Sequence, residues 1–240
     1  MIKKINIVQI SLLAVIIQGC VINLGDSVTG NGNVVEETRY ADDFVSLRVS
    51  NGLDVYLTQG TEIFIKLEVD ENLLEHIKTD ISGKELKIYS DVSIRMAKSK
   101  KIYLGYRNLN EIHISSAGDV KGENTLHTDE LKIRLSSAGD LKLDVIAEEV
   151  DIDISSSGNA LLSGRTGYLH ASLSSAGDLN AFNLEAEKAD VNVSSAGDAK
   201  VFVTGEARFK SSSAGDIVYK GNPEILEMNS SSAGDIRKGK

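Results

Sequence analysis

Apolar and polar residues alternate along the second half of this chain, and the alternation itself recurs about every 19 residues. Around Gly118, for example, Ile112, Ile114 and Val120 are apolar, whereas most residues between them are polar or charged. Equivalent glycines mark seven successive copies: Gly118, Gly139, Gly158, Gly177, Gly197, Gly215 and Gly234. A period of two predicts β-strands that bury one face, and no helical spacing competes with it in this region.

Each of these glycines lies in the sequence Ser-Ser-Ala-Gly-Asp or in a close variant of it. The steps between the glycines are 21, 19, 19, 20, 18 and 19 residues, which is too short for a unit to bury its own apolar face. The alternation continues through the pentapeptide and places its second Ser and its Gly on the inner side. We therefore expect a tight corner with small interior residues, where glycine provides a positive φ.

Two all-β architectures fit a strand, a corner and a strand in every repeat. In a parallel β-solenoid (β-helix) with about 19 residues per coil, each strand stacks on the equivalent strand of the next coil about 4.8 Å away. In an antiparallel β meander or sandwich, each segment is instead a hairpin with a Ser-Ala-Gly loop. The identity of the corners favours the solenoid, because stacked corners must fit the corners above and below them.

Stacked coils would arrange the first Ser and the last residue of each corner in rows. These candidate residues of a binding stripe are Ser115, Asp119, Ser136, Asp140, Ser155, Asn159, Ser174, Asp178, Ser194, Asp198, Ser212, Asp216, Ser231 and Asp235. Neighbouring carboxylates would repel by roughly 0.9 kcal/mol in water. Either the corner serines and amides donate hydrogen bonds to them or a cation such as calcium binds the row. We expect no cofactor and no metal, because the glycine-rich calcium-binding nonapeptide repeat is absent.

The first twenty residues have the composition of an export signal. Lys3 and Lys4 precede an apolar stretch that is too short to span a bilayer, and the single cysteine, Cys20, follows Gly19. This end resembles the lipobox of bacterial lipoproteins, which implies a signal peptide over residues 1–19 and a lipid on Cys20. The alternative is an ordinary cleaved signal or an uncleaved anchor. Residues 20–33 are predicted to form a flexible tether.

Residues 34–240 are predicted to form one continuous domain, with an irregular N-terminal cap over 34–110 and regular coils over 111–240. Within the cap, residues 45–53 resemble a degenerate repeat with Leu53 where Asp would stand, and Asp70 is expected to cap a short helix. Residues 237–240 form a charged tail that is expected to protect the last strand edge. The strands expected inside the cap cover residues 54–57, 63–69, 86–89 and 101–104.

Composition narrows the range of partners. The net charge is -9, which argues against binding of nucleic acid, because contact with phosphates requires a basic face. One cysteine allows no disulfide within the chain, and no Cys or His pair has the spacing of a zinc site.

Four sequence features together resemble a known family. They are Gly32-Asn33-Val34, a Phe-x-x-Leu-x-Val strand over Phe44–Val49, the stretch Gly52–Gly60 and the serial Ser-Ser-Ala-Gly-Asp corners. Over roughly residues 33–235 the chain is similar to the head GIN domain family, which is named for auto-transporter adhesins. The resemblance implies a right-handed parallel β-helix on an outer-membrane lipoprotein of a Gram-negative cell envelope. It does not specify whether the domain faces the periplasm or the cell surface. It supplies no catalytic residues.

These observations predict a non-enzymatic adhesin or binding scaffold whose partner is a glycan or an envelope protein, attached to the membrane through the N-terminal lipid. A polysaccharide lyase or hydrolase is the alternative enzyme class, but the aspartates recur uniformly and no histidine is placed beside a partner. A third alternative is an architectural domain that self-assembles through its strand edges, so an oligomer remains open.

Overall fold

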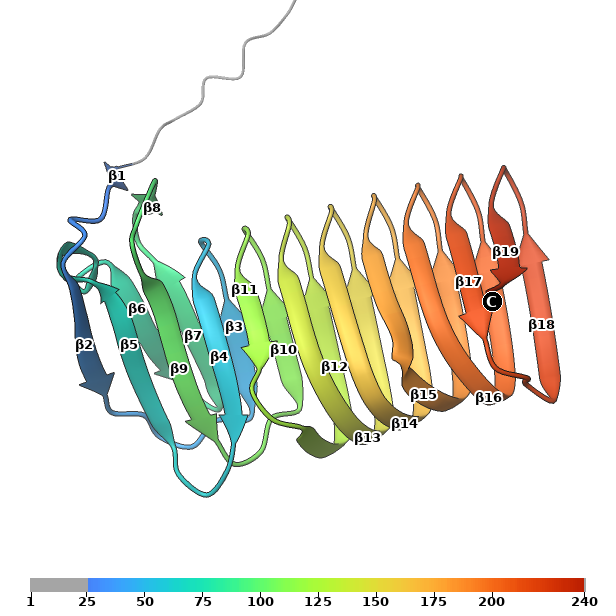
Figure 1. Ribbon diagram of the computed structural model, residues 1–240, viewed down its shortest axis with the longest axis horizontal. Helices are drawn as coiled ribbons and strands as arrows, with labels where there is room; N and C mark the ends of the chain where they lie inside the picture. The colour runs from blue at the N-terminus through green and yellow to red at the C-terminus, as the bar shows by residue number, and fades with distance from the viewer. Residues whose placement is uncertain (1–25, 240) are drawn as a thin grey trace, which may run out of the picture.

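The computed structural model describes residues 26–239, which form one elongated β-solenoid (Figure 1). Among these residues no helix has the length and apolar composition needed to cross a membrane. The elements are β1 (Ser27–Val28), β2 (Val34–Arg39), β3 (Ser46–Val49), β4 (Asp54–Gln59), β5 (Phe64–Asp70), the 3-10 helix η1 (Glu71–Leu73), β6 (Ile77–Ser82), β7 (Glu85–Ser90), β8 (Ser93–Ile94), β9 (Lys100–Tyr106), β10 (Glu111–Ile114), β11 (Asp119–Gly122), β12 (Leu126–Leu135), β13 (Asp140–Ile154), β14 (Asn159–Leu173), β15 (Asp178–Val193), β16 (Asp198–Ser211), β17 (Asp216–Lys220), β18 (Ile225–Ser230) and β19 (Asp235–Lys238).

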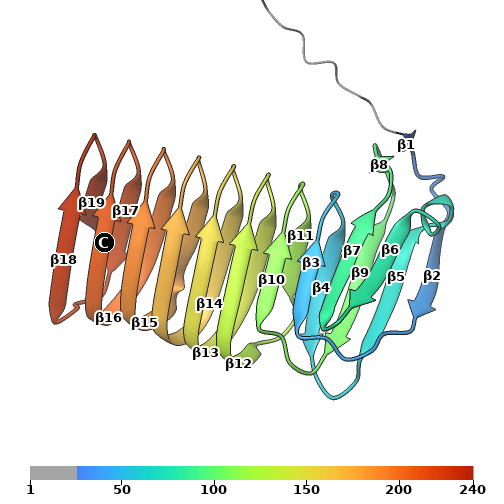
Figure 2. The same cartoon turned by 180° about the vertical axis from the view of Figure 1, so that it is seen from behind.

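The repeats stack in register as parallel strands, so the predicted solenoid is confirmed and the antiparallel meander is wrong. Asp140 pairs with Asn159, and Ile154 at the far end of the same strand pairs with Leu173, one repeat later. Each coil consists of a strand, a broad bend, a second strand and a Ser-Ser-Ala-Gly-Asp corner. As the chain advances from left to right in Figure 1, the nearer strands run downward and the farther ones upward, which makes the solenoid right-handed (Figures 1 and 2).

The coil has two long faces. We call the face that follows the corner the Asp face; it contains β2, β5, β9, β4, β11, the first halves of β13–β16, β17 and β19. We call the face that leads into the corner the Ser face; it contains β6, β7, β3, β10, β12, the second halves of β13–β16 and β18. Inward side chains from both faces form one continuous apolar core, as the alternation predicts.

The corner is built differently from the expectation. In the coil of Ser174–Asp178, positive φ angles occur at Ser175 (52°) and Ala176 (60°), and Gly177 N donates to Ser174 O at 3.0 Å. Two successive residues with positive φ and this hydrogen bond define a type I′ turn. The expectation of a positive φ at the glycine is therefore wrong, and so is the inner placement of the second Ser, since Ser175 is exposed.

The glycine is required for space instead. A Cβ on Gly177 would lie 2.9 Å from Ile154 O and 2.9 Å from Ile154 Cγ2 of the preceding coil. The corners also bond to one another, because Ala176 N donates to Ser195 O of the next coil at 3.1 Å. Each left-handed non-glycine residue costs roughly 1–2 kcal/mol. The hydrogen bonds between stacked corners offset part of this cost.

The N-terminal cap contains two further coils that are out of chain order. The β3–β4 coil stacks directly on β10 and β11, and β7 and β9 stack outside it, while β2 and β6 close the two faces as antiparallel strands. Asp119 pairs with Asp54, which places Leu53 at the glycine position. The prediction that Leu53 replaces the repeat Asp is therefore wrong by one residue. The four strands expected within the cap are present.

The described part of the expected tether is attached to the cap. β1 pairs with β8, and Gly32 N donates to Asp70 Oδ2 at 2.9 Å. Asp70 occupies the N-cap position of η1, as predicted, but its buried side chain makes no hydrogen bond to that helix. Its carboxylate also accepts from the backbone of Lys98 and Ser99 at 3.2 and 3.0 Å. The signal peptide and Cys20 lie outside the described residues.

Candidate functional site

The corner aspartates form one row along the Asp face. Register pairing joins each member to the next: Asp54, Asp119, Asp140, Asn159, Asp178, Asp198, Asp216 and Asp235. Parallel strands place such residues about 4.8 Å apart. The row is therefore a line of closely spaced carboxylates interrupted at Asn159.

Like charges within this row affect its titration. Partial burial and the neighbouring carboxylates of Asp178 and Asp216 raise the pKa of Asp198. Burial followed by the carboxylates of Asp54 and Asp140 likewise raises the pKa of Asp119. Both groups consequently hold their protons to higher pH than an isolated Asp.

Four local contacts reduce the repulsion. Lys100 Nζ lies 3.6 Å from Asp54 Oδ1 in the cap. Asn159 Nδ2 donates to Asp140 Oδ1 at 2.7 Å. Arg237 lies 2.6 Å from Asp235 and 3.8 Å from Asp216 at one end of the row. In the part of the chain that the structure describes, no hydrogen bond joins the Ser of a corner to its Asp, and no three His, Cys, Asp or Glu side chains are grouped closely enough for a metal ion.

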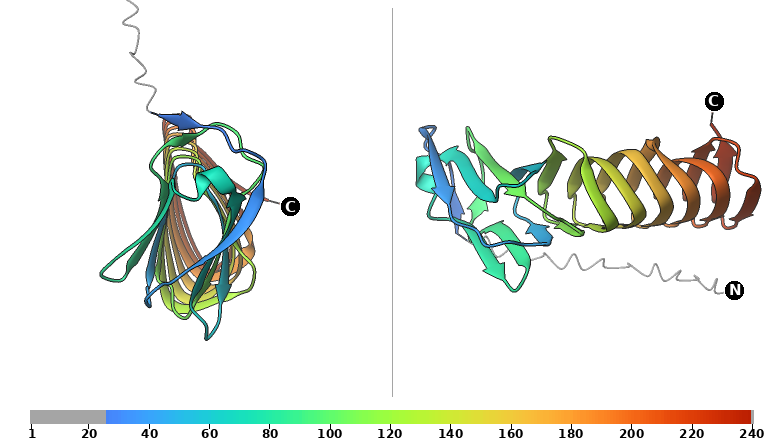
Figure 3. Two further views of the ribbon diagram at one scale, coloured as in Figure 1. Left: turned by 90° about the vertical axis from the view of Figure 1, so that its left-hand side faces the viewer. Right: turned by 90° about the horizontal axis from the view of Figure 1, so that it is seen from below.

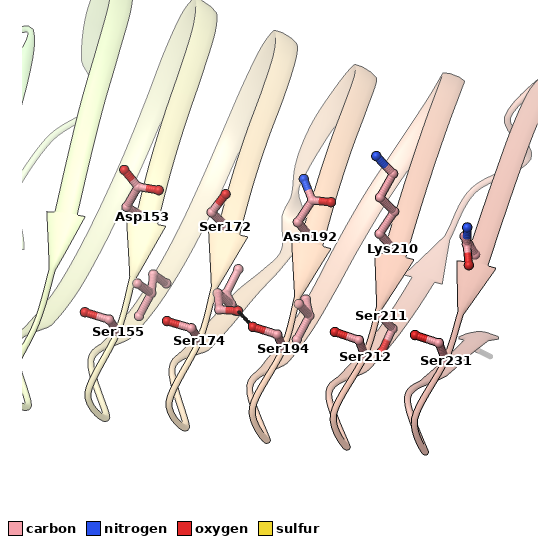
Figure 4. Close-up of a pocket in the computed structure, with 14 residues that line it drawn as sticks. Asp153, Ser155, Ser172, Ser174, Asn192, Ser194, Lys210, Ser211, Ser212 and Ser231 are labelled. Atoms are coloured by element: carbon pink, nitrogen blue, oxygen red, sulfur yellow. Dashed lines mark hydrogen bonds between the residues drawn. The ribbon is translucent and has the colours of Figure 1, made fainter.

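The first serines of the corners form a separate row on the Ser face. Figure 4 shows Ser155, Ser174, Ser194, Ser212 and Ser231 side by side, with Asp153, Ser172, Asn192 and Lys210 in a parallel row. Because the turn reverses the chain between the first Ser and the Asp, the two rows lie on opposite faces. The predicted single stripe of hydroxyls and carboxylates is therefore two stripes separated by a ridge of turns.

Each row borders a groove that spans several coils. The groove on the Ser face has a volume of about 600 Å³ and extends from Asp153 to Ser231. The groove on the Asp face has a volume of about 710 Å³ and extends from Asp119 to Arg237; Lys142 and Lys200 add positive charge to its lining. All seven predicted Ser–Asp pairs are thus brought into rows, but the structure assigns them to two surfaces.

An aromatic pair beyond the Asp-face groove was not predicted. Lys220 Nζ lies 5.6 Å from the ring centre of Phe182 and 4.7 Å from that of Phe202. Phe182 is the extra residue of a β-bulge, because Leu161 pairs with Asn180 and Ser163 pairs with Asn183. The 20-residue step of this repeat was the available signal, since a bulge adds one residue and redirects a side chain.

The four histidines, which an enzyme site could use as acid or base, are dispersed over the molecule. His76 contacts Asp91 at 3.0 Å in the cap, and His170 lies against Tyr168 with ring centres 4.0 Å apart. His113 contacts Arg48 on the Ser face, and burial followed by the charges of Arg48 and Arg134 lowers the pKa of His113. His127 lies at a bend. These histidines share no common site.

Three cap residues have structural roles. Tyr56 and Tyr103 stack with ring centres 5.1 Å apart on the Asp face. Gln59, from the Gly52–Gly60 stretch of the resemblance, accepts from His127 N at 2.8 Å and donates to His127 O at 3.0 Å. Its amide therefore joins the cap to the first regular bend.

Comparison with known proteins supports the same fold. Residues 43–223 match the profile of the family described as "Putative auto-transporter adhesin, head GIN domain". No curated protein matches the chain. A crystal structure of a putative adhesin from Bacteroides fragilis has a TM-score of 0.83 and 22% identity, over 88% of this chain and 100% of that one.

Two structures from Parabacteroides are also similar. A putative adhesin from Parabacteroides merdae has a TM-score of 0.75 and 21% identity, over 90% of this chain and 100% of that one. A protein described as a putative lipid binding protein from Parabacteroides distasonis has a TM-score of 0.71 and 22% identity, again over 90% and 100%. At these identities the likeness establishes the shared fold.

Proposed function

Because this chain belongs to the head GIN domain family, we propose that it is a non-enzymatic adhesin or binding scaffold of the cell envelope. The observation that carries the proposal is the pair of grooves that run along the solenoid, each lined by one row of repeated corner residues. A repeated surface suits an extended partner, which meets equivalent groups at every coil. A glycan or an extended segment of an envelope protein has this character.

The Asp face offers the stronger recognition chemistry. Carboxylates accept hydrogen bonds from hydroxyls and amides, and ionised acceptors make stronger bonds than neutral ones. Asn180, Lys200 and Val218 line the groove, and the Phe182–Phe202 pair follows two residues further along the same strands. Aromatic faces can pack against the apolar side of a sugar or peptide. The Ser face offers weaker neutral donors and acceptors.

A binding array of glycans and envelope proteins tests this proposal with the full chain. One variant carries Asp178→Asn, Asp198→Asn and Asp216→Asn, and a second carries Ser174→Ala, Ser194→Ala and Ser212→Ala. The matched control carries Glu148→Gln and Glu187→Gln, both exposed at the bends. We expect the Asp-row variant to lose binding, with unchanged circular dichroism and an unchanged control. Equal binding by all three variants would exclude these rows as the contact surface.

The non-enzymatic part of the proposal has its own test. Incubation of the full chain with a panel of polysaccharides should leave their length distribution unchanged. Depolymerisation that a single substitution abolishes would replace the scaffold with an enzyme.

The envelope location rests on the sequence of the first twenty residues. We propose that Cys20 carries a lipid that holds the domain at the membrane. Labelling with a radioactive fatty acid should mark the wild-type chain and not Cys20→Ala, which should leave the membrane fraction. Labelling of both chains would contradict this attachment.

A further inference from the structure

The C-terminal end of the solenoid presents unpaired strand edges and apolar side chains. Within residues 26–239, β18 pairs with β16 and β19 pairs with β17, and neither has a partner on its outer side. Met228 is 53% exposed, whereas Phe209 at the equivalent position one coil earlier is 1% exposed. Ile236 is likewise only partly buried, above the fully buried Ile217. Among residues 26–239, the last coil therefore has no neighbour of the kind that covers each earlier coil.

The charged residues at this end do not cover it. Arg237 and Lys238 were expected to belong to a protective tail, but both lie within β19. Arg237 points along the Asp row to Asp235, and Lys238 Nζ donates to Asn222 Oδ1 at 2.6 Å. Open edges of this kind pair readily with another strand.

We propose that a second copy of this chain docks on this end, so that β18 of each copy pairs with β19 of the other about a two-fold axis parallel to the strands. The cross-section narrows toward the corners (Figure 3), and this axis places corner upon corner. It also exchanges the Asp face with the Ser face, so that the upward β18 meets a downward β19 (Figures 1 and 2). The new pairs are antiparallel and continue both sheets.

The register follows from the pleat, because inward residues must face inward residues across the new pair. In the register that keeps the corners level, Met228 lies opposite Ile236 of the second copy. Glu227 then lies opposite Arg237, and Asn229 opposite Asp235. One apolar pair, one ion pair and one hydrogen-bonding pair thus form, and the two-fold axis repeats each of them. This complementarity favours a second copy over an unrelated occupant.

A head-to-tail stack is disfavoured by the other end of the molecule. There Arg39 of β2 donates to Leu74 O at 2.9 Å and to Ile77 O at 2.5 Å, and so bridges the two faces across the end of the core. Leu73 beneath it is fully buried. A two-fold contact between open ends instead closes on itself and gives a dimer.

Sedimentation equilibrium of the purified full chain in density-matched detergent tests this proposal. We expect a concentration-dependent dimer. Glu227→Arg should weaken it about tenfold or more, because like charges then meet across both pairs. Arg237→Glu should do the same, and the double variant E227R/R237E should restore the dimer. These residues are exposed, so both variants should fold.

Disulfide trapping provides a second readout in a Cys20→Ala background. A chain with Glu227→Cys mixed with a chain carrying Arg237→Cys should yield a cross-linked heterodimer, whereas Glu148→Cys mixed with Arg237→Cys should not. A monomer at every concentration would overturn the proposal. So would a dimer that neither charge reversal weakens, or assemblies that grow beyond two copies.

Discussion

The two ends of the solenoid terminate the same core in different ways. At the N-terminal end, antiparallel strands β2 and β6, the helix η1 and the side chain of Arg39 cover the last apolar layer, so Leu73 and Ile77 are 0% and 1% exposed. In the last coil of the described residues, Leu226 and Met228 are 37% and 53% exposed. Each coil of a repeat can bind a further copy of itself, so covering the apolar core at an end requires residues that differ from the repeat.

The largest difference between the ends should appear on truncation of their apolar side chains. Leu73→Ala should lower the free energy of unfolding by about 2–5 kcal/mol, because it leaves a cavity beneath the cap. Met228→Ala should cost less than about 1 kcal/mol, since the side chain is half exposed. Urea denaturation at a concentration that keeps the chain monomeric measures both. Equal losses would mean that the cap protects no more core than the open end.

The buried carboxylate of the cap should give the next largest effect. Asp70→Asn should cost about 2–3 kcal/mol at neutral pH, because the new amide would face backbone N–H donors. Burial by itself raises the pKa of Asp70, but hydrogen bonds from Gly32, Lys98 and Ser99 outweigh it and hold the pKa below its usual value.

This lowered pKa fixes the direction of a pH dependence. The contribution of Asp70 is fully present above the pKa of an unfolded Asp, about 3.9, and is lost as the pH falls through the lower folded value. The difference in unfolding free energy between wild type and Asp70→Asn should therefore shrink on acidification. A difference that grows below pH 4 would show that the carboxylate is not stabilised by these bonds.

Stability should depend on the corner glycine in the regular coils, whereas the cap coil accepts a larger residue at the equivalent position. Gly177→Ala should cost about 1–3 kcal/mol, because its Cβ would overlap the preceding coil. The cap coil carries Leu53 at the equivalent position, fully buried. Ala176→Gly is the matched control and should be neutral or stabilising, since Ala176 has a positive φ. Thermal unfolding of both variants shows whether the glycine is needed because a Cβ does not fit or because of its backbone conformation.

The smallest predicted effect concerns the Asp row, which is interrupted in the regular coils and bordered by Lys100 in the cap. Asn159→Asp should lower stability by about 1 kcal/mol at low salt, because it removes a donor to Asp140 and adds a like charge. The loss should decrease in 1 M salt, where the screening length is about 3 Å. A loss that salt does not change would assign the effect to the hydrogen bond alone.

Strand positions within the repeats could be predicted because they follow from local alternation. The apolar positions around the glycines of the first six copies are the buried ones, and the nearly constant spacing gave the coil length. The corner conformation was not predictable from glycine alone, since Ser175 and Ala176 adopt the positive φ angles. In this conformation Ser175 O accepts from Ser157 N of the preceding corner, and Ala176 N donates to Ser195 O of the next one. The family resemblance correctly supplied the handedness.

The candidate surface was predicted only in part. Ser174 and Asp178 are four residues apart in the sequence, and simple alternation places both side chains on the outside of the coil. Which outer face each residue occupies depends on the turn between them, and that turn separates the two rows. Phe182 was missed because a bulge breaks the local period. The position of Asp70 at the start of η1 was predicted, but the partners of its side chain were not, because its donors are 28 to 38 residues away.

By itself, the sequence determined coils of about 19 residues and the identity of the residues that repeat along them. It favoured a parallel stack of these coils, and the family resemblance added the right-handed winding. Hydrophobic alternation acts between neighbours in the chain, and this information is present in every repeat. Only the tertiary structure decided the out-of-order coils of the cap, the separation of Ser and Asp onto two faces, and the contrast between a covered and an open end. Each of these depends on contacts between distant residues, where packing space and unpaired backbone groups override the local pattern.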